Sequence, residues 1–166
     1  MTLNFFQKLG ENRDRMPDHP ALQHITRDHR ESFSYSRIAE EVNKIGGFLR
    51  DQGVGPGQSV GIVMENHPRW GIAFLAVQST GARIVPLDIL HSTRTLAELL
   101  DHAECRFLIS SHILLAEMDE IQKALPQPLP LLMTGEPAGD YFHWETILEQ
   151  STETKSFPLV EGDLDE

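Results

Sequence analysis

The chain has 166 residues, 40% of them hydrophobic, which suffices for one domain with a buried core. Fourteen Lys and Arg against 25 Asp and Glu give a formal net charge of −11, which repels phosphate backbones and anionic membrane surfaces, so nucleic acid is excluded as an expected partner. The single cysteine, Cys105, rules out an intramolecular disulfide framework and favours a reducing compartment, where we expect it as a buried structural thiol.

Targeting and membrane signals are also missing from the sequence. The chain does not open with a basic segment followed by a long apolar run, and no stretch approaches the ~18 apolar residues of a membrane span. We therefore expect a soluble, cytoplasmic protein.

The first predicted element is a β-hairpin. Two short runs, residues 21–26 and 31–35, are separated by the charged residues 27–30, and we place this hairpin at an edge. A helix follows, because Ile38, Val42, Ile45 and Leu49 recur at the spacing of one helical face.

Glycines and a proline in residues 51–57 end that helix. Residues 53–57 superficially resemble a nucleotide loop, but a phosphate-binding loop needs the order strand, loop, helix. Here the order is helix, loop, strand, so a tight turn is favoured.

Residues 59–64 form a short apolar run bounded by turn residues, which is typical of a buried parallel strand. We expect Asn66 to cap the next helix, with Pro68 in its first turn and Gly81 at its left-handed C-terminal position. That helix is almost continuously apolar, so most of its surface should be covered.

Strands and helices continue to alternate after Gly81. Residues 83–87 predict a buried strand that stops at a proline, and residues 107–109 and 130–133 predict two more. The intervening helices are marked by two apolar sets: Leu96, Leu99, Leu100 and Ala103, and then Leu114, Met118, Ile121 and Leu125. The predicted fold is α/β, a parallel sheet with helices on both faces built from flavodoxin-like or Rossmann-like βαβ units. We assign residues 1–166 to a single domain whose residues 136–166 are less regular, with one short helix through Trp144 to Leu148.

Two motifs point to a family. Residues 33–38 (FSYSRI) and 81–88 (GARIVPLD), with residues 53–62 and 65–70 between them, resemble the adenylate-forming (AMP-binding) acyl-CoA synthetases over residues 20–135. The first looks like the family's aromatic-Ser/Thr-Tyr motif, and the second like its Gly-Ala, apolar strand and Pro-Leu-Asp motif. The positions that match these structural motifs are Tyr35, Gly81, Pro86 and Asp88.

This resemblance implies a reaction in two steps, formation of an acyl-adenylate from a carboxylate and ATP, then transfer to CoA. Family members carry a phosphate loop ending in Pro-Lys, adenine and ribose motifs and a catalytic lysine, none of which occurs in the 166 residues. Residues 161–166 are similar to the acidic run that precedes the phosphate loop. We therefore expect an N-terminal subdomain that is inactive alone, has no catalytic residue and binds no cofactor itself. ATP, Mg and CoA would serve the parent enzyme.

The implied partners are a second N-terminal subdomain and a C-terminal domain. An apolar interface left exposed without them would favour self-association.

Ligands of open parallel sheets bind outside the carboxyl ends of the strands, which selects the loops at residues 65–68, 88–93 and 110–112. The resemblance implies that the loop after Asp88 lies where the pantetheine arm of CoA approaches the acyl-adenylate. Our candidates for a wall of the acyl and CoA sites are Asn66, His67, Trp70, Phe74, His91, Ser92 and Thr93. Ser92 or Thr93 acting as a helix cap, and Trp70 and Phe74 acting as core, are the competing interpretations.

The eight histidines show no His-x3-His spacing and no paired Cys-x2-Cys, so we predict no metal site. Two other functions stay open. One is a naturally short, non-catalytic binding or regulatory module of the same fold, and the other is a flavodoxin-like nucleotide or flavin binder, because fold alone does not determine function. The carboxylic acid, and the choice between CoA and a carrier protein as acceptor, also stay open.

Overall fold

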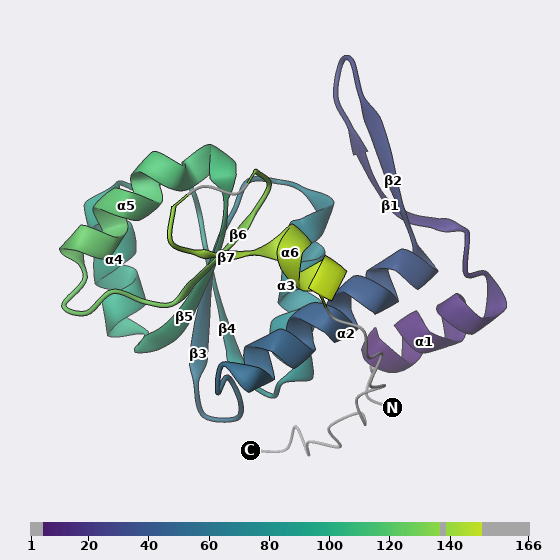
Figure 1. Ribbon diagram of the computed structural model, residues 1–166, viewed down its shortest axis with the longest axis horizontal. Coiled ribbons are helices and arrows are strands. Elements are labelled where there is room, and N and C mark those ends of the chain that lie inside the picture. Colours follow the sequence, from purple (N-terminus) through teal and green to yellow (C-terminus); the bar gives the residue numbers. More distant parts are fainter. Residues whose placement is uncertain (1–4, 137–138, 151–166) are drawn as a thin grey trace.

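The computed structural model describes residues 5–136 and 139–150, and its centre is a parallel sheet of five strands in the order β4-β3-β5-β6-β7 (Figure 1). The strands are β3 (Ser59–Val63), β4 (Arg83–Leu87), β5 (Cys105–Ser111), β6 (Leu131–Thr134) and β7 (Phe142–His143). Every neighbouring pair in this sheet runs parallel. The predicted α/β fold is confirmed, and β7 is an addition to the four strands expected from the sequence.

Helices cover both faces of this sheet, as Figure 1 shows. They are α2 (Tyr35–Asp51), α3 (Pro68–Ser79), α4 (Thr93–His102), α5 (Leu115–Ala124) and α6 (Trp144–Gln150), with a short 3-10 turn, η1 (His112–Leu114), before α5. Successive strand residues point to opposite faces. Val60 and Ile62 of β3 accordingly join the core under α2, α3 and α6, whereas Val63 joins the core under α4 and α5.

The predicted hairpin is present as β1 (Pro20–Ile25) and β2 (Arg30–Ser34). These strands pair with each other in a separate antiparallel sheet that projects from the edge of the domain (Figure 1). The fully buried Phe33 fixes the base of the hairpin in the core under α2. A further helix, α1 (Phe5–Arg15), packs against α2 and was not expected, because its sequence ends in a charged run and has no repeating apolar stripe.

The sequence analysis predicted the burial of β4 wrongly. Arg83 and Pro86 are exposed, and the remaining residues of the strand are half-buried. The reason is its position, since among the described strands β4 pairs only with β3 and forms an edge of the sheet. Pro86 suits an edge because it has no N–H to donate to a second neighbour.

Pro68 and Gly81 lie at the two ends of α3 as predicted. Pro68 is its first residue, and Gly81 adopts a φ of +80° just after the helix ends. A Cβ at Gly81 would lie 3.1 Å from Cγ of Pro56, so both the backbone and the close approach favour glycine here. Among the described residues, no helix combines the length and the apolar character needed to cross a membrane.

Candidate functional site

The carboxyl ends of β3, β4, β5 and β6 meet at one edge of the sheet because these strands are parallel. This carboxyl edge consists of the segments that follow the strands, which are residues 64–67, 88–92, 112–114 and 135–136, together with Thr93, the first residue of α4. It is the place where an open parallel sheet presents ligand-binding loops. Of the three loops predicted from the sequence, those at residues 65–68 and 88–93 lie at this edge as loops. Most of the third, at residues 110–112, belongs to β5.

The loop between β3 and α3 carries Asn66 and His67. Asn66 is exposed, and the prediction that it caps α3 is wrong. The cap is His67, whose Nδ1 accepts a hydrogen bond from the backbone N–H of Arg69 at 3.2 Å. The physical reason is that Pro68 occupies the first helical position, so the residue just before it has the extended backbone of an N-cap.

The loop between β4 and α4 is shaped by Asp88 and Ser92. The carboxylate of Asp88 accepts a hydrogen bond from the backbone N–H of Leu90 at 2.9 Å. The hydroxyl of Ser92 accepts one from the N–H of Thr95 at 3.1 Å, so of the two predicted caps of α4, Ser92 and Thr93, Ser92 is the cap. His91 is exposed, and Leu90, with 87% of its surface accessible, is the most exposed large hydrophobic residue of the described chain.

Most of the third predicted loop, at residues 110–112, belongs to strand β5. Ser110 and Ser111 are the buried last residues of β5, and only His112 lies beyond them, in η1. The Ser110 hydroxyl donates to the carbonyl of Val63 at 2.7 Å, and the Ser111 hydroxyl donates to the carboxylate of Glu65. Both serines therefore tie β5 to the end of β3, which leaves their hydroxyl protons engaged within the protein.

Trp70 and Phe74 form a stacked pair on α3, with ring centroids 5.7 Å apart. Both are half-buried and pack against the core under α2, so the structure places them in the packing of that core. Tyr35 begins α2 and stacks with His19, with 6.5 Å between the ring centroids.

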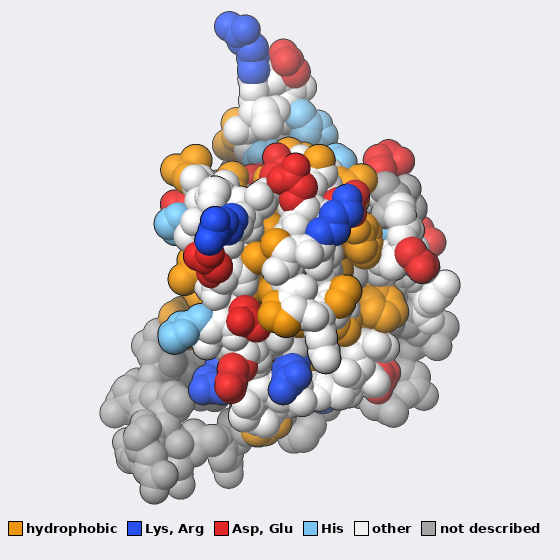
Figure 2. Space-filling view, turned by 90° about the vertical axis from the view of Figure 1, so that its left-hand side faces the viewer, with side chains coloured by type: hydrophobic (Ala, Val, Ile, Leu, Met, Phe, Trp, Pro, Cys, Tyr) orange, Lys and Arg blue, Asp and Glu red, His pale blue; other side chains and the backbone are white. Residues whose placement is uncertain are grey.

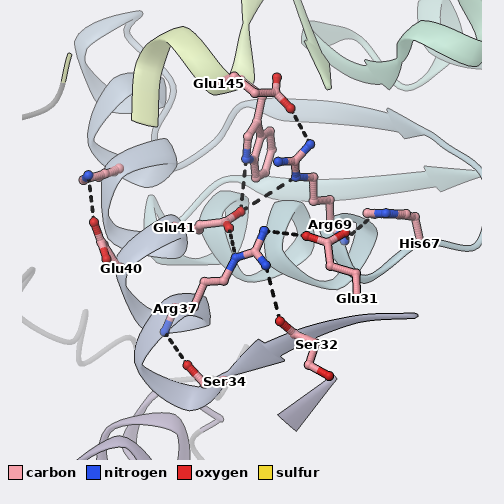
Figure 3. Close-up of polar contacts among 11 residues, drawn as sticks. Glu31, Ser32, Ser34, Arg37, Glu40, Glu41, His67, Arg69 and Glu145 are labelled. Atoms are coloured by element: carbon pink, nitrogen blue, oxygen red, sulfur yellow. Dashed lines mark hydrogen bonds and ion pairs between the residues drawn. The ribbon is translucent and has the colours of Figure 1, made fainter. Parts of the chain in front are cut away.

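A polar network that the sequence analysis missed joins α2, α3 and α6 (Figure 3). Glu41 is 4% exposed, and its carboxylate accepts hydrogen bonds from Nε of Arg37 at 2.9 Å and from the indole Nε1–H of Trp144 at 3.1 Å. Arg69 lies on its other side, with Nε 3.9 Å from Glu41 and Nη1 paired to Glu145. The burial of Glu41 could have been predicted from the sequence, because Glu41 falls between Ile38 and Ile45 on the apolar stripe of α2.

Arg69 and Glu145 connect this network to the carboxyl edge. Both carboxylate oxygens of Glu145 lie 3.2 Å from the backbone N–H of Gly135, at the end of β6. Arg69, which connects the network to the carboxyl edge, is thus held between two carboxylates. Within residues 5–136 and 139–150, no three His, Cys, Asp or Glu side chains come together as a metal-binding group would require.

Cys105 is buried at the start of β5, and burial raises the pKa of its thiol to about 11. We expect the folded protein to resist a thiol-specific disulfide reagent at about pH 8, and the urea-unfolded protein to react at once. Because the pKa is raised in the fold, the unfolded thiol ionises first and stability should fall as pH rises from about 9 towards 11. Unfolding curves of the Cys105→Ala variant should lack this part of the slope. Equal rates of modification of Cys105 in the folded and the unfolded chain would contradict the burial of its thiol.

Comparison with known proteins places these features in context. The model of a family described as AMP-binding enzyme matches residues 9–158. Tyrocidine synthase 3 of Brevibacillus parabrevis is 30% identical over 125 residues, which are 75% of this chain and 2% of that protein. The chain therefore spans a small part of this curated relative.

Two solved structures share the fold. A luciferase-like enzyme from the mealworm Zophobas morio superposes with a TM-score of 0.83 at 19% identity, covering 99% of this chain and 39% of that one. Acetoacetyl-CoA synthetase from Streptomyces lividans superposes with a TM-score of 0.80 at 22% identity, covering 92% and 26%. At these identities the likeness concerns the fold alone.

Proposed function

Because this chain belongs to the AMP-binding enzyme family, we propose that it is the N-terminal portion of an ATP-dependent acyl-CoA synthetase. In the proposed reaction a carboxylate attacks the α-phosphate of ATP, giving an acyl-adenylate and pyrophosphate, and the thiol of CoA then displaces AMP to form a thioester. The family match over residues 9–158 is the observation that carries this proposal. The fold shared with acetoacetyl-CoA synthetase supports it.

The described residues do not fit a site for ATP and magnesium. A triphosphate needs unengaged cations or a glycine-rich loop between a strand and a helix. At the carboxyl edge, Arg69 is paired with Glu145 and lies beside Glu41, and the Asp88 and Glu65 carboxylates accept hydrogen bonds from the protein itself. We therefore route no catalytic step through this part of the chain, and we propose that the rest of the parent enzyme holds ATP and magnesium and provides the remainder of the CoA site.

The role that we propose for this chain is to form one wall of the acyl and CoA sites and to be inactive alone. Asn66, His91 and Ser92 are exposed at the carboxyl edge, and His67 and Thr93 are half-buried there, which suits residues that line a wall. Trp70 and Phe74 would support this wall from the core rather than touch the acyl group.

The partners that we propose are the second N-terminal subdomain and the C-terminal domain of the parent enzyme, which we place in the cytoplasm. Ile89, Leu90 and Ile113 are exposed at the carboxyl edge, and hydrophobic side chains also gather on the face that carries α4 and α5 (Figure 2). Such surfaces favour burial against another polypeptide, and a second copy of this chain is the alternative occupant.

A second candidate concerns the acceptor of the acyl group. The curated relative matched here is named for the synthesis of tyrocidine, not of a CoA thioester. In this candidate function the acyl-adenylate forms in the same way, but its acyl group is transferred to a thiol other than that of CoA, such as the thiol of a carrier protein.

The experiment compares the 166-residue chain with the product of the complete reading frame that encodes it. Both are assayed for acid-dependent exchange of pyrophosphate into ATP, using a panel of fatty, aryl and amino acids, and then for thioester formation with CoA or a carrier protein. We expect exchange by the complete product and none above background by the 166-residue chain. Turnover by the short chain, or a complete product that activates no acid, would overturn the proposal and favour a non-catalytic module.

A further inference from the structure

Two histidines form part of the contact between the hairpin and the start of α3. His67 caps α3 through its Nδ1, which accepts the N–H of Arg69. The ring of His24 from β1 meets the His67 ring edge-on, with 4.6 Å between centroids, and the Phe33 ring from β2 lies 6.1 Å from it. One imidazole therefore both caps the helix and contacts the two strands of the hairpin.

Charged groups surround His67 from the elements packed around it. Its burial lowers its pKa below the usual range, and the neighbouring His24 from β1 and Arg69 from α3 act in the same direction. Glu31 from β2 and Glu65 from the loop after β3 oppose this shift. The neutral ring is thus the form that the folded protein favours, in agreement with its role as a hydrogen-bond acceptor.

We propose that His67 is a pH-sensitive latch, which fastens the β1–β2 hairpin to the start of α3 while its ring is neutral and loosens that contact when Nδ1 takes up a proton, while Phe33 keeps the base of the hairpin in the core. A protonated Nδ1 is a donor and cannot accept the N–H of Arg69, so the cap is lost. The imidazolium also places a positive charge at the positive end of the α3 dipole, beside Arg69.

The direction of the pH dependence follows from the lowered pKa. In the unfolded chain His67 has an ordinary pKa of about 6.5, above its value in the fold. The unfolded state therefore binds the proton first as pH falls. The stabilisation from this contact is complete above about pH 6.5 and is lost as pH drops through the lowered folded value.

The test is an NMR titration of the 166-residue chain from about pH 7.5 to about pH 5, with hydrogen exchange measured on the hairpin amides. As the His67 ring nitrogens titrate, we expect the Arg69 amide signal to move. After correction for intrinsic exchange, protection of the β1–β2 amides should fall by about fivefold, the size of a lost helix cap. If His67 titrates while the Arg69 and hairpin amides stay unchanged, the proposal is overturned.

Two variants make the test specific. His67→Asn keeps a side chain that caps helices well but does not titrate, so the loss of hairpin protection at low pH should disappear. His29→Asn is the matched control, because His29 is exposed at the turn of the hairpin, and this variant should keep the wild-type response. Persistence of the pH response in His67→Asn, or its loss in His29→Asn, would contradict the assignment to His67.

Discussion

Replacement of Glu41 by glutamine is expected to lower the free energy of unfolding by about 3 kcal/mol. The carboxylate is buried and lies between Arg37, Arg69 and the indole of Trp144. Removal of one partner from a buried ion pair costs more than the pair contributes, because the remaining charge stays desolvated. Arg37 keeps Glu31 and Arg69 keeps Glu145, so we expect the lower end of the usual range.

Glu40→Gln on the same helix provides the matched control for this prediction. The Glu40 side chain is 53% exposed and pairs with Lys44 at 2.8 Å. Lys44 is 15% exposed but also donates to the carbonyl of Leu148 at 2.8 Å, so the loss of this i,i+4 pair should cost only about 0.5 kcal/mol. Urea unfolding curves of both variants measure the difference, and equal losses would show that Glu41 does not hold α2, α3 and α6 together.

Gly61→Ala should lower the free energy of unfolding by about 2 kcal/mol. Gly61 lies in the middle of β3, and a Cβ placed on it would come within 2.4 Å of Cδ2 of Leu100 and 3.1 Å of Cδ1 of Leu108. Both leucines are fully buried, so they have little room to move aside. The added methyl group therefore overpacks the core under α4 and α5.

Gly10→Ala is the control for this change, because a Cβ at Gly10 in α1 meets no atom within 4 Å. Alanine is the better helix former, so we expect no loss of stability there. Thermal unfolding of the two variants tests the prediction, and an unchanged midpoint for Gly61→Ala would mean that the core beneath α4 is loosely packed.

The alternation of strands and helices was predictable because each buried strand is a short apolar run between turn residues. Residues 59–64 and 130–133 illustrate this, since both become strands with almost the predicted bounds. The burial of β4 was not predictable in the same way. An apolar strand at the edge of a sheet has the same composition as a central one, and only the order of the strands distinguishes them. β7, with two residues, is too short to show any periodicity.

The position of the candidate site was predictable from the sequence, but most of its side-chain contacts were not. Rules for parallel sheets correctly selected the loops after β3 and β4, and Ser92 was recognisable as a cap from its residue type. The cap by His67 was missed because histidine is an uncommon N-cap and Asn66 precedes it. The network around Glu41 joins residues about one hundred positions apart, and no local pattern links Glu41 with Trp144.

The most direct test of the central claim is to sequence the gene beyond codon 166. The account predicts that the reading frame continues and that a Ser/Thr/Gly-rich loop ending in Pro-Lys follows within about a dozen residues. A stop codon directly after Glu166 would contradict it, and the carboxyl edge would then have to be examined as the binding surface of a short, non-catalytic protein.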